Sequence, residues 1–382
     1  MCIRDRPKKR VHILMTGGHI TPAIATIEEL RARFPDWHIV FVGRRKAIEG
    51  QRSVAEEQRL IEGMGLRFVP LVTGRLKREG GIGTLFSLLK FPVGLVQSAM
   101  IVARERPTII VSFGGYVALP VVCVAWVFRI PVVTHEQTTR PGLANRIISR
   151  FASRVCVSFP ESSHELGVAG KVEITGLPMR HGVLVAPKNN PFSVVPSLPL
   201  LLFLGGSTGS VSINEKVFAA LPHLLSRFTI IHQVGRISEQ LAQKAKASLP
   251  SNLQKHYLPY PYLSTEEYSY ALHHASLIIG RSGANTVTEI AIVGKVAVCI
   301  PLPWAANNEQ YHNAKFLEHG GSAIILVQKD LTPRTLEDAI DRMMSELPER
   351  TSKAKALAKR IPKDGAKRFV DVISQVLLPH TP

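Results

Sequence analysis

One local arrangement occurs twice in this chain and constrains its fold more than any other feature: a short apolar strand, a glycine turn and a helix. The first copy joins apolar residues 11–15 to a helix expected from Pro22, and the second joins residues 200–204 to a helix expected near Ser212. Further apolar stretches of strand length alternate with segments long enough for a crossover helix. This alternation is typical of a parallel sheet covered by helices on both faces. The sequence therefore predicts two similar α/β units.

The segment between the two copies favours neither a helix nor a central strand. Four prolines lie between residues 187 and 199, and proline breaks helices and central strands because it lacks a backbone donor. We therefore divide the 382 residues into a first domain at 7–182, a linker at 183–199, a second domain at 200–350 and C-terminal helices at 351–382.

The charge of the chain points to an anionic partner. The sequence has 47 Lys and Arg against 29 Asp and Glu, a formal charge of +18. Such a charge fits nucleic acid, an acidic membrane surface or a phosphorylated substrate, and a generally basic, solvated surface is the plain alternative. The sequence has no RNA- or DNA-binding motif, so nucleic acid is not an expected partner.

A membrane span, an export signal and a disulfide framework are not expected. The longest apolar run, Tyr116 to Phe128, contains Pro120 and is well short of the ~20 residues that a span requires. The first residues lack an apolar signal core. The cysteines have no metal-ligand or redox spacing and are interpreted as reduced core residues: Cys2, Cys123, Cys156 and Cys299.

Three glycine turns follow predicted strands and precede predicted helices: Thr16-Gly17-Gly18, Gly205-Gly206-Ser207 and residues 280–289. In open α/β sheets, ligands bind beyond the carboxyl ends of the strands, where a helix N-terminus can hold an anion. The alternative is steric, because tight turns need glycine whether or not they bind a ligand. In the third turn Glu289 can bind ribose hydroxyls, or it can simply complement the helix dipole.

Six motifs in the correct order resemble those of the MurG family of glycosyltransferases, and together they span nearly the whole chain. In the first half they are residues 14–23, Phe113-Gly114-Gly115-Tyr116, and His135-Glu136-Gln137 with residues 141–146. In the second half they are Gly205-Gly206-Ser207, residues 281–289, and residues 301–303 with 308–314.

The resemblance implies a fold and a reaction. The fold is GT-B, two Rossmann-like α/β domains with an interdomain cleft, and the C-terminal helices pack back on the first domain. The reaction is an inverting transfer of N-acetylglucosamine from UDP-GlcNAc to the muramyl 4-hydroxyl of lipid I, the undecaprenyl-diphospho-muramylpeptide. A base removes the hydroxyl proton and UDP leaves. No cofactor is implied, and since the chain has no Asp-x-Asp triplet, we expect fixed dipoles and cations rather than a metal to stabilise the diphosphate.

The resemblance also assigns residues to the two substrates. The donor residues are Arg180, Ser207, Ser282, Gly283, Ala284, Asn285, Thr286, Glu289 and Gln310. The acceptor residues are Thr16, Gly17, Gly18, Gly114, Gly115, Tyr116, His135, Gln137 and Thr138. Arg180 can also be a plain surface cation near the linker.

His19 and Glu136 are the candidate catalytic residues. A neutral imidazole can accept a proton near pH 7, although His19 can instead cap the adjacent helix or bond to its loop. Glu136 stands at a predicted strand end, where an acid can be held by local backbone N–H groups. The sequence leaves the choice of base open.

A basic and apolar segment indicates contact with a bilayer. Its cations are Lys77 and Arg78, and its apolar residues are Leu85, Phe86, Leu89 and Phe91. Such a combination lets a protein rest on an anionic membrane without spanning it; the alternative is an amphipathic core helix with a solvated basic edge. Since the implied acceptor is a lipid, we expect peripheral attachment to the cytoplasmic face of the inner membrane.

The chain departs from the family pattern at three places, and two related functions stay open. Leu14 and Met15 stand where glycines are usual, Thr138 where asparagine is usual, and Glu309 where histidine or glutamine is common. A GT-B transferase for another lipid, such as diacylglycerol, would share the donor motifs. A UDP-GlcNAc 2-epimerase would convert the donor without an acceptor. A NAD-dependent dehydrogenase is disfavoured because the first turn lacks the dinucleotide fingerprint.

Overall fold

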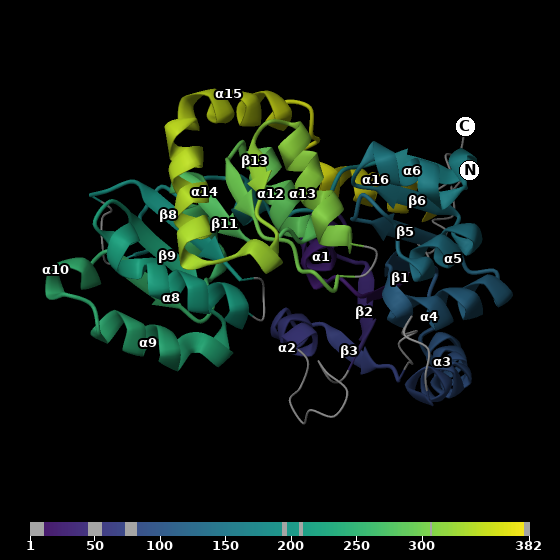
Figure 1. Cartoon of the computed structure of the whole chain (residues 1–382). Helices are drawn as coiled ribbons and strands as arrows, with labels where there is room; N and C mark the ends of the chain where they lie inside the picture. The colour runs from purple at the N-terminus through teal and green to yellow at the C-terminus, as the bar shows by residue number, and fades with distance from the viewer. Residues whose placement is uncertain are drawn as a thin grey trace. The chain divides into compact units, whose positions relative to one another are not determined.

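The chain forms two compact units, Met1–Arg180 with Asp364–Pro382, and His181–Lys363 (Figure 1). The computed structural model describes residues 11–44, 56–72, 82–192, 197–205, 209–305 and 308–377. Each unit contains one parallel sheet with helices on both faces, so the two α/β units predicted from the sequence are confirmed.

The described residues of the N-terminal unit form a sheet of seven strands in the order β3-β2-β1-β4-β5-β6-β7. The strands are β1 (His12–Gly17), β2 (His38–Gly43), β3 (Arg67–Pro70), β4 (Ile109–Phe113), β5 (Val132–Glu136), β6 (Arg154–Val157) and β7 (Val172–Ile174). The helices are α1 (Ile20–Arg33), α2 (Glu56–Gly63), α3 (Ile82–Glu105), α4 (Gly115–Val127), α5 (Leu143–Phe151), α6 (Pro160–Leu166) and α16 (Gly365–Leu377).

Two apolar layers cover this sheet. Because side chains alternate along a strand, Leu14 packs with α3, α4 and α5, whereas Ile13 and Met15 pack with α1 and α16. The last helix of the chain therefore completes the core of the N-terminal unit, where α16 lies against α1.

In the C-terminal unit, the part of the chain that the structure describes forms a sheet of six strands in the order β10-β9-β8-β11-β12-β13. They are β8 (Leu200–Leu204), β9 (Thr229–Gln233), β10 (Tyr257–Tyr260), β11 (Leu277–Gly280), β12 (Ala297–Cys299) and β13 (Ala323–Ile325). The helices are α7 (His181–Leu184), α8 (Val211–Leu225), α9 (Glu239–Ala247), α10 (Ser251–Gln254), α11 (Thr265–His274), α12 (Ala284–Val293), α13 (Glu309–His319), α14 (Pro333–Ser345) and α15 (Leu347–Ala358).

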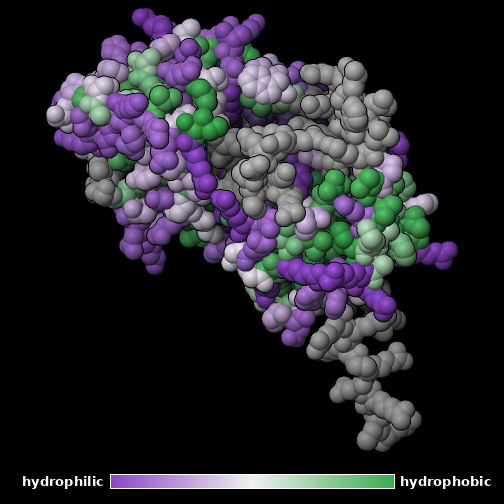
Figure 2. Space-filling view, turned by 90° about the horizontal axis from the view of Figure 1, so that it is seen from below, coloured by the Kyte–Doolittle hydropathy of each residue, from purple (hydrophilic) through white to green (hydrophobic). Residues whose placement is uncertain are grey.

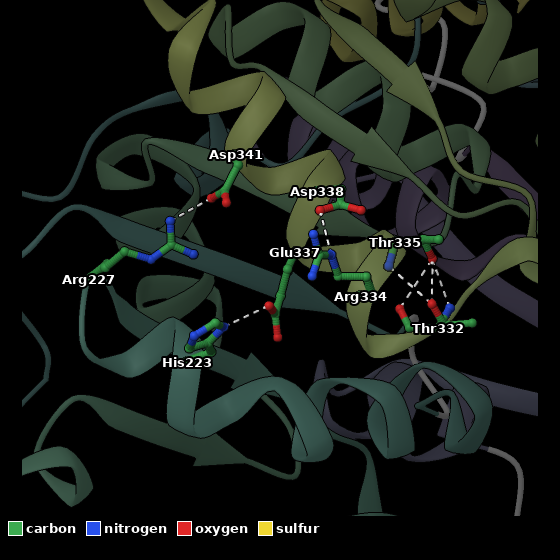
Figure 3. A network of polar contacts seen from close by, with 8 residues as sticks. All are labelled: His223, Arg227, Thr332, Arg334, Thr335, Glu337, Asp338 and Asp341. Atoms are coloured by element: carbon green, nitrogen blue, oxygen red, sulfur yellow. Dashed lines mark hydrogen bonds and ion pairs between the residues drawn. The ribbon is translucent and has the colours of Figure 1, made fainter.

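Helix α14 packs on α8 through apolar side chains, with a polar fringe at the surface. Thr332 caps α14 by accepting a hydrogen bond from the Thr335 N–H at 3.1 Å. His223 of α8 and Arg227, just after α8, reach Glu337 and Asp341 at 2.9 and 2.7 Å (Figure 3). Exposed ion pairs of this kind contribute about 1 kcal/mol at most. The buried apolar contacts therefore hold the two helices together.

The last two helices of the chain belong to different units, because their apolar faces pack on different helices. The boundary between the units falls after Arg180, next to the segment that the sequence assigned to a linker. Residues 351–382 are shared between the units, because α15 packs on α12 with Ala354 and Leu357, whereas α16 packs on α1 with Phe369 and Ile373. Within the described residues, no helix is both long and apolar enough to cross a bilayer.

Both sheets reverse their strand order at the first strand of the unit. β1 lies between β2 and β4, and β8 lies between β9 and β11. In open α/β sheets this switch point is where ligands bind, beyond the carboxyl ends of the strands. The glycine turns after β1, β4, β8 and β11 all lie at these two points.

Candidate functional site

The turns after β1 and β4 pack directly on each other in the N-terminal unit. The Gly18 N–H donates to the Gly114 carbonyl at 3.1 Å. Gly114 and Gly115 have φ angles of 71° and 80°, a region that other residues adopt only at a cost. A Cβ on Gly114 would also lie 2.2 Å from Oδ1 of Asn145. Close packing alone requires these glycines, as the steric interpretation expected.

Asn145 connects these turns to the end of β5, and the sequence analysis did not assign it a role. Its Oδ1 accepts a hydrogen bond from the Gly115 N–H at 2.9 Å, and its Nδ2 donates to Glu136 at 2.5 Å. The available signal was an amide in the first turn of a predicted helix, within the third motif. Its partners are 30 and 9 residues away in the chain, so the sequence did not identify them.

Glu136 is buried and its carboxylate is fully engaged. One oxygen accepts from the Thr138 N–H and hydroxyl, both at 2.8 Å, and the other accepts from Asn145. Three local donors hold this carboxylate in one orientation. The geometry therefore favours the structural alternative for Glu136 and a positioning role for the turn that contains Thr138.

His19 lies at the start of α1 and is half-buried. Its side chain makes no cap hydrogen bond to α1. Burial lowers the pKa of His19, the charge of Glu136 and the Phe113 carbonyl oppose this shift, and the charge of Arg44 adds to it. The ring is therefore neutral near pH 7 and can accept a proton.

Gln137 fixes the orientation of the His19 ring. Its side-chain amide contacts Nδ1, which also lies 3.4 Å from the Phe113 carbonyl oxygen. Oε1 of Gln137 is buried and has no partner among the described residues, so turning this oxygen to a protonated Nδ1 satisfies both groups. The Nε2 lone pair of His19 is then free to accept a proton.

His135 points to the other face of the sheet. It is fully buried, its Nε2 lies 3.0 Å from the Gly176 carbonyl, and its ring packs against Phe369 of α16 at 5.2 Å between centroids. Burial lowers its pKa to about 4. His135 therefore points away from Glu136, as strand alternation dictates.

Thr16, Gly17 and Tyr116 complete the acceptor set at the strand ends. The Thr16 hydroxyl is buried and has no partner among the described residues. A Cβ on Gly17 would approach Cβ of Phe113 at 3.0 Å. The Tyr116 hydroxyl accepts a hydrogen bond from Arg44 at 2.7 Å.

The N-terminus of α12 is the candidate donor site in the C-terminal unit. Gly283 precedes the helix with φ −62°, and a Cβ built on it would have no atom within 4 Å. Neither conformation nor packing therefore requires glycine at position 283, unlike at Gly114. Open space before a helix N-terminus suits a bound anion.

The residues around this turn are held in place by α13. The Ser282 hydroxyl donates to the Gln310 carbonyl at 2.8 Å, and the Gln310 side chain accepts from the Leu302 N–H at 3.0 Å. The Asn313 amide donates to the Ser282 carbonyl at 3.3 Å. Ser282 and Gln310, both assigned to the donor, are thus brought together.

Further along α12, Ala284, Asn285 and Thr286 are half-buried in its first turn. Oδ1 of Asn285 is buried with no partner among the described residues. Glu289, one turn later, is buried and accepts a hydrogen bond from the Tyr268 hydroxyl at 2.5 Å. Tyr268, which the sequence analysis missed, therefore orients the acid assigned to the ribose.

Arg281 holds the residues next to the donor turn together through its hydrogen bonds, and the sequence analysis gave it no separate role. Its guanidinium donates to the carbonyls of Ile300 and Pro301 at 3.1 and 3.2 Å, and to Ser210, Ser212 and Gln328 at 2.8, 3.2 and 2.6 Å. Burial lowers its pKa to about 10, so it stays charged. This cation joins the ends of β11 and β12 to the start of α8.

Two further residues were assigned to the donor, Ser207 and Arg180. Ser207 lies outside the described residues. Arg180 is half-buried at the end of the N-terminal unit. Gly205 and Gly209 have steric causes, since a Cβ on Gly205 would lie 2.7 Å from the Ser210 nitrogen and Gly209 has φ 78°.

An exposed apolar surface covers the outer side of α3 and the end of α4. On α3 it contains Val93, Val96 and Met100, which are 48%, 60% and 59% exposed. At the end of α4 it contains Trp126, Val127 and the following Phe128, which are 58%, 68% and 56% exposed. Figure 2 shows hydrophobic residues gathered on this face of the N-terminal unit. Arg104 and Arg129 are exposed beside them.

Most of the membrane segment predicted from the sequence lies outside the described residues. This holds for Lys77 and Arg78 and for the side chains of Leu85, Phe86 and Leu89, which belong to α3. Phe91 is described and packs against the core of the unit. Within the described residues, no cluster of His, Cys, Asp or Glu could hold a metal ion.

Comparisons with known proteins find a family domain in each half of the chain. Residues 15–157 match the glycosyltransferase family 28 N-terminal domain, and residues 200–369 match the glycosyltransferase family 28 C-terminal domain. The chain is similar to the UDP-N-acetylglucosamine--N-acetylmuramyl-(pentapeptide) pyrophosphoryl-undecaprenol N-acetylglucosamine transferases of Treponema denticola and Desulfitobacterium hafniense. The identities are 32% and 34%, over 87% and 94% of this chain and 86% and 96% of the relatives.

A solved structure extends the likeness to three dimensions. The crystal structure of Acinetobacter baumannii MurG matches with a TM-score of 0.70 and 28% identity, over 96% of this chain and 99% of that one. The predicted class, two Rossmann-like α/β domains of the GT-B type, is thereby confirmed.

Proposed function

Because the chain belongs to the MurG family of N-acetylglucosamine transferases, we propose that it transfers N-acetylglucosamine from UDP-GlcNAc to the muramyl 4-hydroxyl of lipid I. The observation that carries the proposal is the open N-terminus of α12, where Gly283 is required neither by its φ angle nor by its neighbours. Glu289 lies one turn further along the same helix. A diphosphate at the helix N-terminus with the adjacent ribose near an acid is the arrangement that a nucleotide sugar needs.

The donor is bound mainly by the C-terminal unit. Ser282 to Thr286 supply backbone N–H groups and short side chains for the diphosphate, and the buried Arg281 adds a fixed positive charge beneath them. Glu289 accepts the ribose hydroxyls in the orientation that Tyr268 sets. Ser207, Gln310 and Arg180 complete the donor set in this proposal.

His19 is the catalytic base. Its Nε2 takes the proton of the muramyl 4-hydroxyl while that oxygen bonds to the anomeric carbon from the face opposite the leaving group. The bond from the anomeric carbon to the phosphate oxygen breaks, and the negative charge passes to UDP. The α12 N-terminus stabilises this developing charge with dipoles that are already in place. The residues fit a metal-free reaction.

The acceptor is bound by the N-terminal unit. The proposed residues are the strand-end turns with Gly18, Gly114 and Tyr116, together with Gln137 and Thr138. Glu136 and Asn145 position the turns and His19 is held by Gln137, so the acceptor meets a pre-arranged site.

A transfer assay tests the proposal. The purified protein is incubated in detergent with radiolabelled UDP-GlcNAc and a short-chain lipid I analogue, and both labelled lipid and released UDP are followed. We expect label in the lipid fraction only when the acceptor is present. Conversion of the donor without acceptor would contradict the proposal and indicate an isomerase, and transfer only to another lipid would indicate a different acceptor.

We further propose that the apolar surface on α3 and α4 rests on an anionic bilayer, the cytoplasmic face of the inner membrane. Exposed valines, Met100 and Trp126 beside Arg104 and Arg129 give apolar burial and attraction to anionic headgroups together. The positive charge of the chain then serves the bilayer and the diphosphates rather than nucleic acid.

Sedimentation with vesicles tests the membrane proposal. We expect binding to vesicles of phosphatidylglycerol and phosphatidylcholine, and much weaker binding to phosphatidylcholine alone. Trp126→Ser combined with Val96→Ser should reduce binding several-fold. Trp304→Ser is the matched control because Trp304 is exposed in the other unit. Equal losses in both variants would contradict the assignment of this surface.

A further inference from the structure

A group of lysines lies at the amino-terminal end of the C-terminal sheet, whereas the donor turn lies at the carboxyl end. Lys295 follows α12 and precedes β12. A Cβ on Gly294 would lie 3.4 Å from Cα of Lys355, so the end of α12 packs directly on α15. Lys355 and Lys359 are four residues apart, in the last turn and at the C-cap of α15, and therefore share one face of that helix. Lysines from two elements thus meet on one surface.

The positive charges on this surface act on one another. Burial lowers the pKa of Lys295, and the charge of Lys355 lowers it further. Burial also lowers the pKa of His273 at the end of α11; a backbone carbonyl opposes this shift, and nearby cations that include Lys363 add to it. The positive region therefore extends from α15 to the end of α11. Its lysines are called the basic surface below: Lys295, Lys355, Lys359 and Lys363.

Carboxylates are scarce in the segments that form the basic surface. Residues 350–363 contain six Lys and Arg and no Asp or Glu. Residues 270–300 contain one acid, Glu289, which accepts a hydrogen bond from Tyr268. Earlier in α15, Lys353 pairs with Glu349 at 2.5 Å. Within the described part of the chain, the four lysines of the basic surface form no ion pair with a carboxylate, so their charge is available to a partner.

The basic surface offers charge without exposed apolar side chains. Among the described residues, none of the exposed large hydrophobic side chains belongs to α11, α12 or α15. The ring of Tyr270 in α11 stacks on His274 at 3.9 Å between centroids and packs against Phe192. Peripheral bilayer contacts usually insert apolar residues among the headgroups, and single-stranded nucleic acid needs aromatic faces for its bases. Neither partner fits this surface well.

The four charges lie at different depths. Lys355, Lys359 and Lys363 are exposed, whereas Lys295 is half-buried and its Nζ donates to the Ala275 carbonyl at 3.0 Å. A flat layer of headgroups meets the exposed ammonium groups first. Asp and Glu side chains on a polypeptide can also reach the recessed ammonium of Lys295, which has two further protons to donate.

We propose that the basic surface docks a segment of a partner protein that is rich in Asp and Glu. Complementary charge speeds such an encounter and fixes its register. Because the surface and the donor turn lie at opposite ends of the strands, docking leaves the donor turn open. The inference is independent of the proposed sugar transfer. The plain alternative is that these lysines only complement the C-terminal ends of α11, α12 and α15.

Fluorescence anisotropy with a labelled oligoglutamate peptide tests the docking. We expect the wild-type protein to bind the peptide, and to bind it more weakly as the salt concentration rises. Lys355→Gln combined with Lys359→Gln should weaken binding by about tenfold or more. Lys355→Arg combined with Lys359→Arg keeps both charges and should bind like the wild-type protein. Equal affinities of the wild-type protein and the glutamine variant would overturn the proposal.

The matched control is Lys244→Gln combined with Lys255→Gln. Both lysines are exposed in the same unit beside β10, an edge strand that is distant from β12 in the sheet. The control removes the same charge and should leave the peptide affinity within about twofold of wild type. Equal losses in the two double variants would overturn the proposal, because net charge rather than the basic surface would then bind the peptide. Both variants should keep the wild-type KM for UDP-GlcNAc.

Lys295 distinguishes a polypeptide from a bilayer. Lys295→Met keeps the apolar stem and removes the recessed charge, so it should weaken peptide binding severalfold and leave binding to phosphatidylglycerol vesicles unchanged. If the Lys355 and Lys359 variant loses vesicle binding but keeps peptide binding, the proposal is overturned and the surface belongs to the bilayer. Oligouridylate that binds more tightly than oligoglutamate of equal charge, and is lost in the same variant, would overturn it in favour of nucleic acid.

Discussion

The two units place the same strand, turn and helix at the same topological position, yet their glycines serve different purposes. In the N-terminal unit, Gly114 and Gly115 have positive φ and pack against Asn145 and Gly18. In the C-terminal unit, Gly283 has ordinary backbone angles and open space around it. The first turn holds side chains in place, and the second leaves open space before a helix N-terminus.

The polar groups differ in the same way. The N-terminal switch point holds a neutral histidine and a carboxylate whose oxygens are engaged by local donors. The C-terminal one holds a buried arginine beneath a helix N-terminus. Proton transfer needs the first environment, and stabilising a departing diphosphate needs the second.

The largest effect is expected from removing the His19 imidazole, which tests the role assigned to the N-terminal unit. His19→Ala should lower kcat by about 10²–10⁴-fold, the usual contribution of a general base, and should leave UDP-GlcNAc binding unchanged because the donor is bound by the other unit. Single-turnover transfer and donor titration measure the two quantities. His38→Ala, at the amino-terminal end of the sheet, is the control. A small loss of kcat in His19→Ala would transfer the role of base to another group.

Acid should destabilise both units, each through a buried histidine. Burial lowers the pKa of His135 to about 4 and of His232 to about 3, against roughly 6.5 in an unfolded chain. Unfolded chains then bind more protons below pH 6.5, so this stability is complete above pH 6.5 and is lost as pH falls. The full losses are about 3 kcal/mol for His135 and about 5 kcal/mol for His232.

Calorimetric unfolding between pH 7.5 and 3 measures this effect. Both units should lose stability at the same rate down to about pH 4, and below that the contribution of His232 should continue to fall while that of His135 levels off. His38→Gln alters an exposed histidine and should not change the profile. Stability that is constant between pH 7.5 and 5 would refute the assignment of both rings as neutral.

A pair of glycine substitutions tests whether the two turns need glycine for different reasons. Gly114→Ala should lower the free energy of unfolding by about 1–3 kcal/mol, because alanine is strained at that φ, and its Cβ meets Asn145. Gly283→Ala should leave stability unchanged or slightly raised and instead raise the KM for UDP-GlcNAc. Urea unfolding and donor kinetics separate the two effects. The same response from both variants would remove the distinction between the two turns.

The sequence was sufficient for the fold and for the strand ends at which most of the candidate residues lie. Apolar strands followed by glycine turns predicted both sheets, and the motifs predicted which strand ends carry polar groups. Alternation along β5 also separates His135 from Glu136. The sequence did not show which of the two faces α16, far along the chain, would cover, because that depends on packing. Phe369 of α16 packs against His135 and buries that face of the sheet.

The side-chain partners could not be predicted because they come from distant parts of the chain. Glu136 is engaged through Asn145, and Arg281 draws its partners from residues 210, 212, 300, 301 and 328. Arg44 is similar, since its link to Tyr116 spans 72 residues. The role of each of these polar groups depends on the hydrogen-bond partners that lie at neighbouring strand ends. Motif matching identifies the residue types but not these partners.

The smallest expected effect concerns Tyr268, which orients Glu289 through one hydrogen bond of 2.5 Å. Tyr268→Phe keeps the ring and removes only this donor, so Glu289 keeps its charge but loses one constraint on its position. We expect the KM for UDP-GlcNAc to rise about three- to tenfold, in line with one hydrogen bond to a charged group, with kcat little changed.

Tyr262→Phe is the control for this measurement, because Tyr262 is exposed in the same unit and its hydroxyl should not affect the donor. The result also tests the comparison between the units. If kcat falls and KM does not, Glu289 acts on the transition state and the C-terminal unit does more than bind the donor. If KM alone rises, the division of labour between a catalytic first turn and a binding second turn holds.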